Sequence, residues 1–182
     1  KTFKPRIKAR LRKNRQVLNK NIDNFFGWIK GAKLVELKEC NTEEDPVRPE
    51  LDNEFRTGYG RKIYGVEYQE EIHAVMCFAY TNKIPKSVEE LEKLSTDAFL
   101  QSAMRDQAGG QIAIAYTVWS KKKGGGKLIV KEVFKKIKKS NHLNRLVTLS
   151  PLTEMATKFH TRNGAKLVQI NETTQNFEYK VL

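Results

Sequence analysis

The chain opens with apolar residues that recur at helical spacing among many lysines and arginines. This pattern predicts an amphipathic helix over residues 5–30, because apolar positions three and four apart share one helical face. Pro5 suits a first helical turn, and Gly31 suits the end of the helix. We expect the apolar stripe to pack on a sheet. The basic face is then either solvated surface or an anion-binding surface.

The next stretch predicts strands on either side of a polar segment. A short strand is expected over residues 34–37. Residues 41–60 are polar and contain two prolines and two glycines, which predicts a long mobile loop of the kind that can serve as a substrate lid. Residues 63–68 and 72–80 predict a strand pair. The second of these is almost continuously apolar and is therefore expected at the centre of a sheet.

The remaining chain predicts alternating helices and strands. Ser87 and Glu90 have the spacing of a capping box at the start of a helix. Ser150 precedes another predicted helix and is the expected N-cap. The expected elements are helices over 87–94 and 96–105, a strand over 112–119, a helix to about 139, a strand over 145–149, a helix over 152–163, and strands over 166–170 and 176–181. The sequence therefore predicts one α/β (α+β) domain over residues 1–182.

Composition fits a single globular domain. The chain has 182 residues, of which 39% are hydrophobic and 30% are charged, which is enough for a hydrophobic core. It contains no apolar run near the roughly 18 residues of a membrane span, so no membrane partner is expected. Cys40 and Cys77 lie far apart and form no metal-binding pattern. We expect two buried thiols, no metal, and a reducing cytoplasm.

Positive charge is concentrated in two blocks. The net charge is +13, and residues 1–33 carry eleven Lys or Arg against one acidic residue, Asp23. Residues 121–139 carry nine Lys against Glu132. Such blocks indicate a polyanionic partner, which could be a nucleic acid, a phosphorylated cofactor or an acidic protein.

A glycine-rich turn lies between the predicted strand 112–119 and the helix that follows it. The three glycines Gly124, Gly125 and Gly126 allow consecutive backbone N–H groups to point inward, and the helix N-terminus adds positive potential. Four lysines surround the turn: Lys121, Lys122, Lys123 and Lys127. A pyrophosphate would suit this arrangement. The glycine order matches neither a Walker loop nor a dinucleotide fingerprint. The alternative is a plain basic hairpin before a solvated helix.

Two segments together resemble the GNAT superfamily of acyl-CoA-dependent N-acyltransferases. The run 121–126, Lys-Lys-Lys-Gly-Gly-Gly, is similar to the family's Gln/Arg-x-x-Gly-x-Gly/Ala turn, with Lys121 at its first position. The segment 153–165 matches a later family motif at Ala156, Phe159, Arg162 and Gly164. The resemblance covers residues 111–182. It implies a mixed, mostly antiparallel sheet that splays between strands 112–119 and 145–149, with helices on both faces and residues 87–105 as a helical insert.

The resemblance also implies a ligand and its contacts. The cofactor would be acetyl-CoA or another acyl-CoA, with its pyrophosphate at the turn 121–127 and its pantetheine bonded to backbone near Tyr116 and Val118. Thr153 stands where the family has an Asn near the cofactor. No metal is implied, and the acceptor would be an amine.

Acyl transfer to an amine needs a base and an acid. His160 stands at the family's usual Tyr position and is the candidate proton donor to the leaving thiolate; the alternative is a helix residue packed beside Phe159. Glu67 is the candidate base, and Glu70, Glu71 or a relayed water could take its place. The alternative interpretation is that each of these glutamates is an ordinary surface carboxylate. His73 is expected in the core. Ser150 lacks the flanking glycines of a nucleophile elbow, which excludes serine hydrolysis.

Functions of two classes remain open at this point. One is an N-acyltransferase using acetyl-CoA or a related thioester. The other is a non-catalytic nucleic-acid-binding protein that uses residues 1–33 on phosphates. A combination of the two is a GNAT-fold enzyme that modifies DNA bases, as some bacteriophage members of this fold do, in the cytoplasm of the host.

Overall fold

The computed structural model describes residues 3–102 and 109–180, without the side chains of residues 3–9, 22, 23 and 26. Its helices are α1 (Phe3–Gly31), the 3-10 helix η1 (Thr42–Glu44), α2 (Asn53–Thr57), α3 (Val88–Gln101), α4 (Gly125–Lys138) and α5 (Glu154–Arg162). Its strands are β1 (Lys33–Leu37), β2 (Lys62–Tyr68), β3 (Glu71–Thr81), β4 (Ile112–Ser120), β5 (Arg145–Thr148), β6 (Ser150–Pro151), β7 (Ala165–Ile170) and β8 (Thr174–Tyr179).

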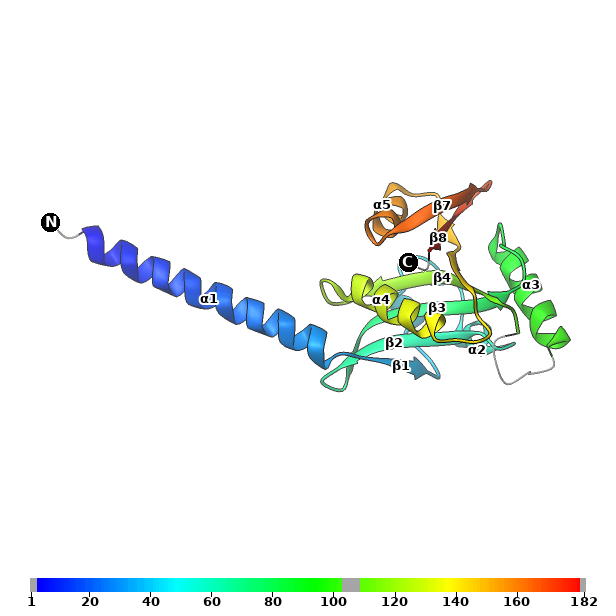
Figure 1. Ribbon diagram of the computed structural model, residues 1–182, viewed down its shortest axis with the longest axis horizontal. Helices are drawn as coiled ribbons and strands as arrows, with labels where there is room; N and C mark the ends of the chain where they lie inside the picture. The colour runs from blue at the N-terminus through cyan, green and yellow to red at the C-terminus, as the bar shows by residue number, and fades with distance from the viewer. Residues whose placement is uncertain (1–2, 103–108, 181–182) are drawn as a thin grey trace.

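All eight strands belong to one sheet (Figure 1). The order is β1-β2-β3-β4-β5-β8-β6, and β7 pairs with β8 outside this path. Only β4 and β5 pair in parallel; the other pairs are antiparallel. Gln69 and Glu70 form the β2–β3 turn with φ values of 53° and 64°, as a two-residue hairpin turn of matching twist requires. The predicted mixed, mostly antiparallel sheet is confirmed.

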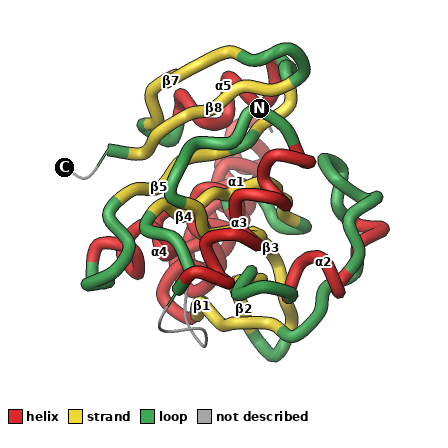
Figure 2. The backbone as a smooth tube through the Cα atoms, turned by 90° about the vertical axis from the view of Figure 1, so that its right-hand side faces the viewer, coloured by secondary structure: helices red, strands yellow, loops and turns green. Residues whose placement is uncertain are grey.

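The sheet carries helices on both faces, which separates two apolar cores. We call the first the α4-side core, because Leu128, Ile129 and Val133 of α4 pack there against Val66 and Met76 of the sheet. The second, the α3-side core, lies on the other face, where Leu91 of α3 packs with Ile63, Cys77 and Ile114, and Phe55 of α2 borders it. Figure 2 shows α4 and α2 on opposite sides of the strands. Helices on both faces were predicted.

A β-bulge interrupts β4 at its middle. Phe78 of β3 lies opposite Ala115, whereas the preceding Cys77 lies opposite Thr117, so Tyr116 is an extra residue in β4. A bulge bends its strand and ends regular pairing nearby. The parallel pairing of β4 with β5 ends at Ala115 and Thr148. Beyond the bulge, residues 116–120 of β4 have no strand partner on the β5 side among the described residues.

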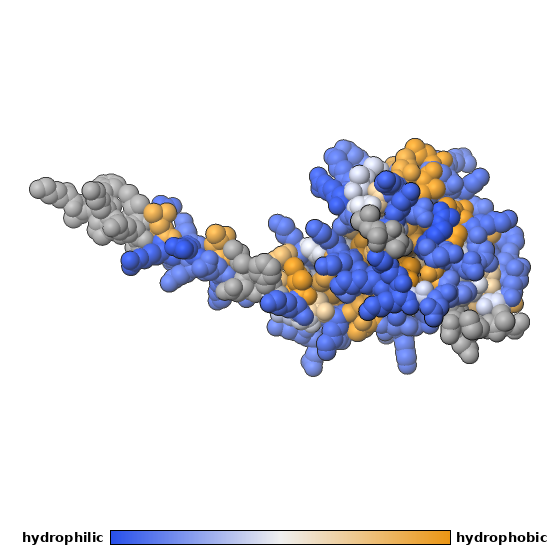
Figure 3. Space-filling view, viewed as in Figure 1, coloured by the Kyte–Doolittle hydropathy of each residue, from blue (hydrophilic) through white to orange (hydrophobic). Residues whose placement is uncertain are grey.

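Helix α1 was predicted correctly as a helix and wrongly as part of the core. Its 29 residues extend away from the sheet as a rod (Figure 1). Trp28 in its last turns is 1% exposed, whereas Leu11, Leu18 and Phe25 are 62%, 59% and 47% exposed. Figure 3 shows apolar surface recurring along this helix. The other helices already cover both faces of the sheet, so most of the apolar stripe has no sheet surface to pack on.

The side chains of Ile7, Ile22 and Phe26, which also belong to the predicted stripe, lie outside the described residues. Among the described residues, neither α1 nor any other helix is both long enough and apolar enough to span a membrane.

The segment 41–60 is not the mobile loop that its composition predicts. It contains η1 and α2, and it buries the charged side chains of Asp45, Arg48 and Arg56. Arg56 Nη2 donates to Asp45 Oδ2 over 2.9 Å, and both side chains are fully buried. Asp45 Oδ1 also accepts from the Thr117 hydroxyl of β4 at 2.7 Å. These bonds fix the segment to the α3-side face of the sheet.

The insert after β3 is a single helix within its described part. Two helices were predicted, over 87–94 and 96–105. Within the described residues this is wrong, because α3 runs without a break from Val88 to Gln101. The predicted cap is confirmed: the Ser87 hydroxyl accepts from the Glu90 N–H at 3.1 Å. Residues 103–105 lie outside the described chain.

Candidate functional site

The glycine turn connects β4 to α4, as the sequence predicts. Gly124 is the N-cap of α4 and has a φ of +85°, a conformation that favours glycine. Gly125 N donates to Lys122 O at 2.9 Å and closes the turn. A Cβ atom on Gly125 would collide with the Ser120 hydroxyl, so this position also needs glycine. The Ser120 hydroxyl bonds Lys122 O at 2.6 Å inside the turn.

The turn leaves backbone donors available at the start of α4. The first bond of this helix that reaches the turn is from Leu128 N to Gly124 O, at 3.0 Å. Among the described residues, the N–H groups of Gly126 and Lys127 have no acceptor. Unpaired N–H groups at a helix N-terminus, together with the helix dipole, form an anion-binding site. Gly124 offers no side chain that could cap them.

The four lysines around the turn do not play equal parts. Lys121 Nζ forms an ion pair with Glu44 of η1 at 2.8 Å, so its charge is already partly neutralised. Lys122 Nζ lies 4.8 Å from the ring centroid of Trp28 and 4.9 Å from that of Tyr68, as a cation–π contact. Lys123 and Lys127 are exposed and lie in no ion pair among the described residues. These two can contact an anion at the turn.

Next to the turn, β4 and β5 part as the resemblance implies. Leu149 N donates to Ala115 O at 2.9 Å, and this is the last backbone bond between the two chain segments. Past it, the Tyr116 carbonyl accepts from Arg48 Nε at 3.2 Å, and the Leu149 carbonyl from Arg48 Nη2 at 3.3 Å. We call this opening between residues 116–120 and Leu149 the β4–β5 gap. Val118, predicted to contact pantetheine with Tyr116, is half-buried and lies along it.

His160 lies in a buried polar network beside the gap. It is 6% exposed, and its Nε2 and Nδ1 lie 2.9 Å from Ser150 Oγ and 2.8 Å from the Tyr179 hydroxyl. Ser150 Oγ donates to Thr148 Oγ1 at 2.9 Å, which assigns the ring proton to Nε2 and makes Nδ1 the acceptor from Tyr179. Burial lowers the pKa of His160 to about 4. The ring is therefore neutral near pH 7, and an imidazolium donor is disfavoured.

The N-cap of α5 is Thr153 and not Ser150, which was predicted to cap this helix. Thr153 is the N-cap, since its hydroxyl accepts from Ala156 N at 3.2 Å. Ser150, the predicted cap, lies in β6 and bonds His160 instead. Thr153, predicted to contact the cofactor, thus holds the start of α5, near the end of the gap.

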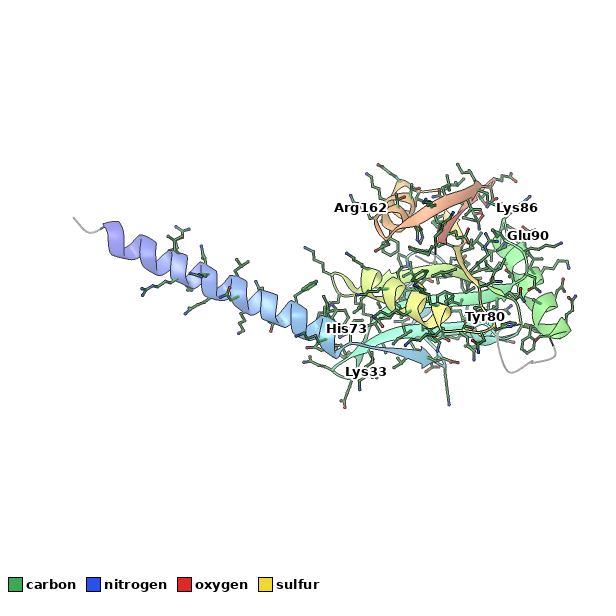
Figure 4. The ribbon with its side chains drawn as sticks, viewed as in Figure 1. Lys33, His73, Tyr80, Lys86, Glu90 and Arg162 are labelled. Atoms are coloured by element: carbon green, nitrogen blue, oxygen red, sulfur yellow. The ribbon has the colours of Figure 1, made fainter. Side chains whose placement is uncertain are left out.

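The predicted base and its substitutes lie away from the gap. Glu67 is half-buried on β2, beside the bulge between Val66 and Glu67, and β2 is separated from β4 by β3. Glu70 and Glu71 are exposed at the β2–β3 turn. His73 Nε2 lies 3.2 Å from the Tyr68 carbonyl. Figure 4 places His73 at the end of the body from which α1 extends.

A cavity of about 520 Å³ lies on the α3-side face between the ends of β1, β3 and β4. Trp119, Ile72 and Leu37 line its apolar part, and Glu39, Glu44 and Lys121 its charged part, in which Glu44 is already ion-paired with Lys121. The cavity is also bordered by Cys40.

Sequence reasoning missed the residues that connect distant segments here. The contacts Asp45–Thr117 and Arg48–Leu149 span 72 and 101 residues, and no local pattern marks them. Both thiols were predicted to be buried; Cys77 is, whereas Cys40 is half-buried just after β1. The two are neighbours, and a hydrogen bond with Cys77 lowers the pKa of Cys40 to about 7. The described residues gather no three His, Cys, Asp or Glu side chains that could hold a metal ion.

Comparisons of sequence find no relatives, whereas comparisons of structure find many. No protein-family model matches the chain, and no curated protein sequence is similar to it. The GphF GNAT-like decarboxylase in complex with isobutyryl-CoA superposes with a TM-score of 0.62 at 9% identity, over 81% of this chain and 98% of that one. A Bacillus subtilis acetyltransferase in complex with CoA gives 0.56 at 12% identity, over 83% and 99%.

The loading GNATL domain of CurA from Lyngbya majuscula also gives a TM-score of 0.56 at 12% identity, over 81% of this chain and 96% of that domain. Identities this low establish the fold and not the reaction. The three superpositions cover both halves of the sheet, although the resemblance in sequence was confined to residues 111–182. The chain therefore has the fold of the GNAT superfamily.

Proposed function

We propose that this protein is an acyl-CoA-dependent transferase that moves an acetyl or related acyl group to an amine acceptor. The observation that carries the proposal is the pair of unpaired N–H groups of Gly126 and Lys127 behind the left-handed Gly124, next to the β4–β5 gap. These groups suit a diphosphate, and the unpaired edge of β4 suits an amide-bearing arm. Structural neighbours in complex with CoA and isobutyryl-CoA support this ligand class.

The residues that would hold coenzyme A divide by the part of the ligand they meet. The turn 124–127 with the side chains of Lys123 and Lys127 would bind the diphosphate. The backbone of β4 from Tyr116 to Val118 would bond the pantetheine arm. When bound, the thioester supplies an activated carbonyl for attack by an amine. No metal is part of this proposal.

For proton transfer, we propose a relay in which the Ser150 hydroxyl gives its proton to the leaving thiolate, His160 Nε2–H reprotonates Ser150, and the Tyr179 hydroxyl reprotonates His160 Nδ1. The proton released by the attacking amine then restores Tyr179, so the His160 ring is never an imidazolium. Its Nε2–H points to the Ser150 hydroxyl, in the segment that directly follows Leu149 at the gap. Replacing His160 by Phe should then slow turnover while leaving coenzyme A affinity nearly unchanged, and Ser150→Ala should slow it similarly. Glu67 stays the predicted base, and its distance from β4 in the sheet order means that it would act through a relayed water.

Calorimetric titration with coenzyme A tests the proposal with a matched pair of variants. Gly124→Ala and Gly164→Ala both place a side chain at positive φ, +85° and +90°, without a close steric contact. Each should cost about 1 kcal/mol of stability. Only Gly124→Ala should weaken coenzyme A binding, by about tenfold or more, because only Gly124 shapes the turn. Equal affinities in the two variants, or no binding by the wild type, would refute the proposal.

A finer proposal concerns the acceptor. We propose that the amine belongs to a nucleic acid or to a molecule bound to one, which includes DNA modification of the bacteriophage type. The supporting observation is that α1 carries its exposed basic residues directly to the glycine turn: Phe25 lies beside Gly124, and Trp28 lies under Lys122. A polyanion along α1 would thus be led to the coenzyme site. We place the reaction in the cytoplasm, where acyl-CoA is made.

Fluorescence anisotropy with a labelled DNA duplex at several salt concentrations tests the acceptor proposal. Changing Arg10, Arg12 and Arg15 together to Gln should weaken binding and flatten its salt dependence, because phosphate contacts release counterions. A control with the same loss of charge changes Lys83, Lys86 and Lys180, which are exposed residues outside α1, and should have little effect. If coenzyme A does not bind but DNA does, the non-catalytic nucleic-acid-binding function is the better account.

A further inference from the structure

Arg48 occupies the closed end of the β4–β5 gap. It comes from the segment between η1 and α2 on the α3-side face. Its Nε donates to the Tyr116 carbonyl at 3.2 Å and its Nη2 to the Leu149 carbonyl at 3.3 Å. These two carbonyls belong to the first residues at which the paired strands separate. The guanidinium therefore bridges the strands at the point where the gap begins.

This guanidinium is buried without a carboxylate partner. Arg48 is 8% exposed, and no described Asp or Glu oxygen lies within ion-pair distance of it. The acids that act on Arg48 are Glu50, Asp45 and Glu89, all beyond ion-pair distance, and burial lowers the pKa of Arg48 in spite of them. Of these, Asp45 is already saturated by Arg56 Nη2, the Thr117 hydroxyl and the N–H groups of Val47 and Arg48. Leaving a buried charge unpaired costs free energy, so such sites are usually completed by a counter-ion.

A comparison with the neighbouring buried arginines distinguishes Arg48. Arg56 has Asp45 as its partner. Arg61 bonds the Phe55 carbonyl and the Ser95 hydroxyl, and its guanidinium stacks 4.4 Å from the Phe55 ring centroid. Arg48 has neither an acid within ion-pair distance nor an aromatic ring, and among the described residues its side-chain hydrogen bonds go to the two carbonyls of the gap.

A second unsatisfied polar group lies in the same bulge. The hydroxyl of Tyr116 is buried and has no hydrogen-bond partner among the described residues, although the side chain is 1% exposed. Buried hydroxyls are nearly always paired, so one without a partner needs an explanation. The residue that makes the bulge thus gives its carbonyl to Arg48 and leaves its hydroxyl unpaired. The Tyr116 ring itself packs edge-on to Phe55 in the α3-side core, and Arg48 is the polar side chain that faces the end of the gap.

We propose that Arg48 forms a carboxylate-binding subsite at the closed end of the β4–β5 gap. A single unpaired guanidinium is balanced by a single negative charge, which favours a carboxylate over a doubly charged phosphate. The inference rests on the proposed function, in which a diphosphate binds at the glycine turn. The five residues 116–120 of β4 separate that turn from the subsite and span about 16 Å. The reactive end of an extended pantetheine arm would lie there. The carboxylate then belongs to the acyl group of the thioester or to the amine acceptor.

Binding and turnover measured in two arms test this subsite and identify the source of the carboxylate. In the first arm, calorimetry compares succinyl-CoA and malonyl-CoA with acetyl-CoA and free coenzyme A. In the second, with acetyl-CoA fixed, turnover of amino acids is compared with that of the amines lacking the α-carboxylate. Each arm uses the wild type, Arg48→Gln and, as the matched control, Arg61→Gln, a buried arginine on the same face but outside the gap.

The proposal expects the wild type to prefer the carboxylate-bearing compound by about tenfold or more in one arm. Arg48→Gln should abolish the preference without changing the affinity for free coenzyme A, and Arg61→Gln should retain it. Lack of preference in both arms, or a preference that survives in Arg48→Gln, overturns the subsite. Failure of free coenzyme A to bind the wild type would overturn the proposed function, and this inference with it. Coenzyme A binding without any carboxylate preference would overturn the inference alone.

Discussion

The ion pair of Asp45 and Arg56 gives the sharpest test of how the segment 41–60 is held. Both side chains are fully buried, and Asp45 accepts four hydrogen bonds. Asp45→Ala would leave the Arg56 guanidinium buried without a counter-charge, which costs about 4 kcal/mol. With a urea m-value of about 2 kcal/mol/M, the midpoint of unfolding should fall by about 2 M at unchanged m. That loss is a large fraction of the stability of a typical domain.

The matched control has the same chemistry at the surface. Lys93 and Asp97 form an i,i+4 pair on α3, and their side chains are 73% and 45% exposed. Asp97→Ala should cost about 0.5 kcal/mol or less, which moves the midpoint by about 0.2 M. If urea unfolding followed by circular dichroism gives similar midpoints for Asp45→Ala and Asp97→Ala, the argument that burial makes the first pair essential is refuted.

Three further predictions concern the described residues outside that pair. The imidazole of His160 gains its proton near pH 6.5 in the unfolded chain but only near pH 4 when folded. The free energy of unfolding should therefore fall by up to about 3 kcal/mol as the pH drops from 6.5 to 4. His160→Asn should remove this part of the pH dependence, measured by urea unfolding at several pH values. Deleting residues 1–23 should leave the melting temperature nearly unchanged, whereas Trp28→Ala should cost about 3–5 kcal/mol, since Trp28 is the buried side chain among those described in α1; the reverse order would contradict this. Iodoacetamide at pH 7.5 should alkylate Cys40 well before Cys77, because hydrogen bonding with Cys77 lowers the pKa of Cys40 and burial raises that of Cys77; peptide mass spectrometry showing equal rates would be incompatible with that environment.

The elements of the fold were largely predictable from the sequence. The apolar run 72–80 predicted a central strand, the run 112–119 predicted a further strand, and the triple glycine predicted the turn before α4. Local periodicity does not, however, specify which surface an apolar stripe meets, which is why α1 was wrongly assigned to the core. Its pattern is the same whether the helix packs on the sheet or extends from it.

The candidate site was predictable only where it depends on contiguous residues. The glycine turn is one such run. By contrast, the closed end of the gap depends on Arg48 meeting Tyr116 and Leu149, which lie 68 and 101 residues away in sequence. Ser150 was taken for a cap because it precedes a helix, whereas its actual partner is His160 in that helix. Long-range polar contacts of this kind have no signature in a single sequence.

The extra residue in β4 makes the architecture of the gap sensitive to chain length. Loss of one codon at Tyr116 would restore uninterrupted alternation along the strand, with Thr117 and Trp119 still facing the α3 side and Val118 the α4 side. The second half of the strand could then continue its ladder with the neighbouring chain, sealing the opening. Within one protein lineage, a single in-frame deletion could thus convert a ligand-binding scaffold of this kind into a closed sheet without any substitution at the glycine turn.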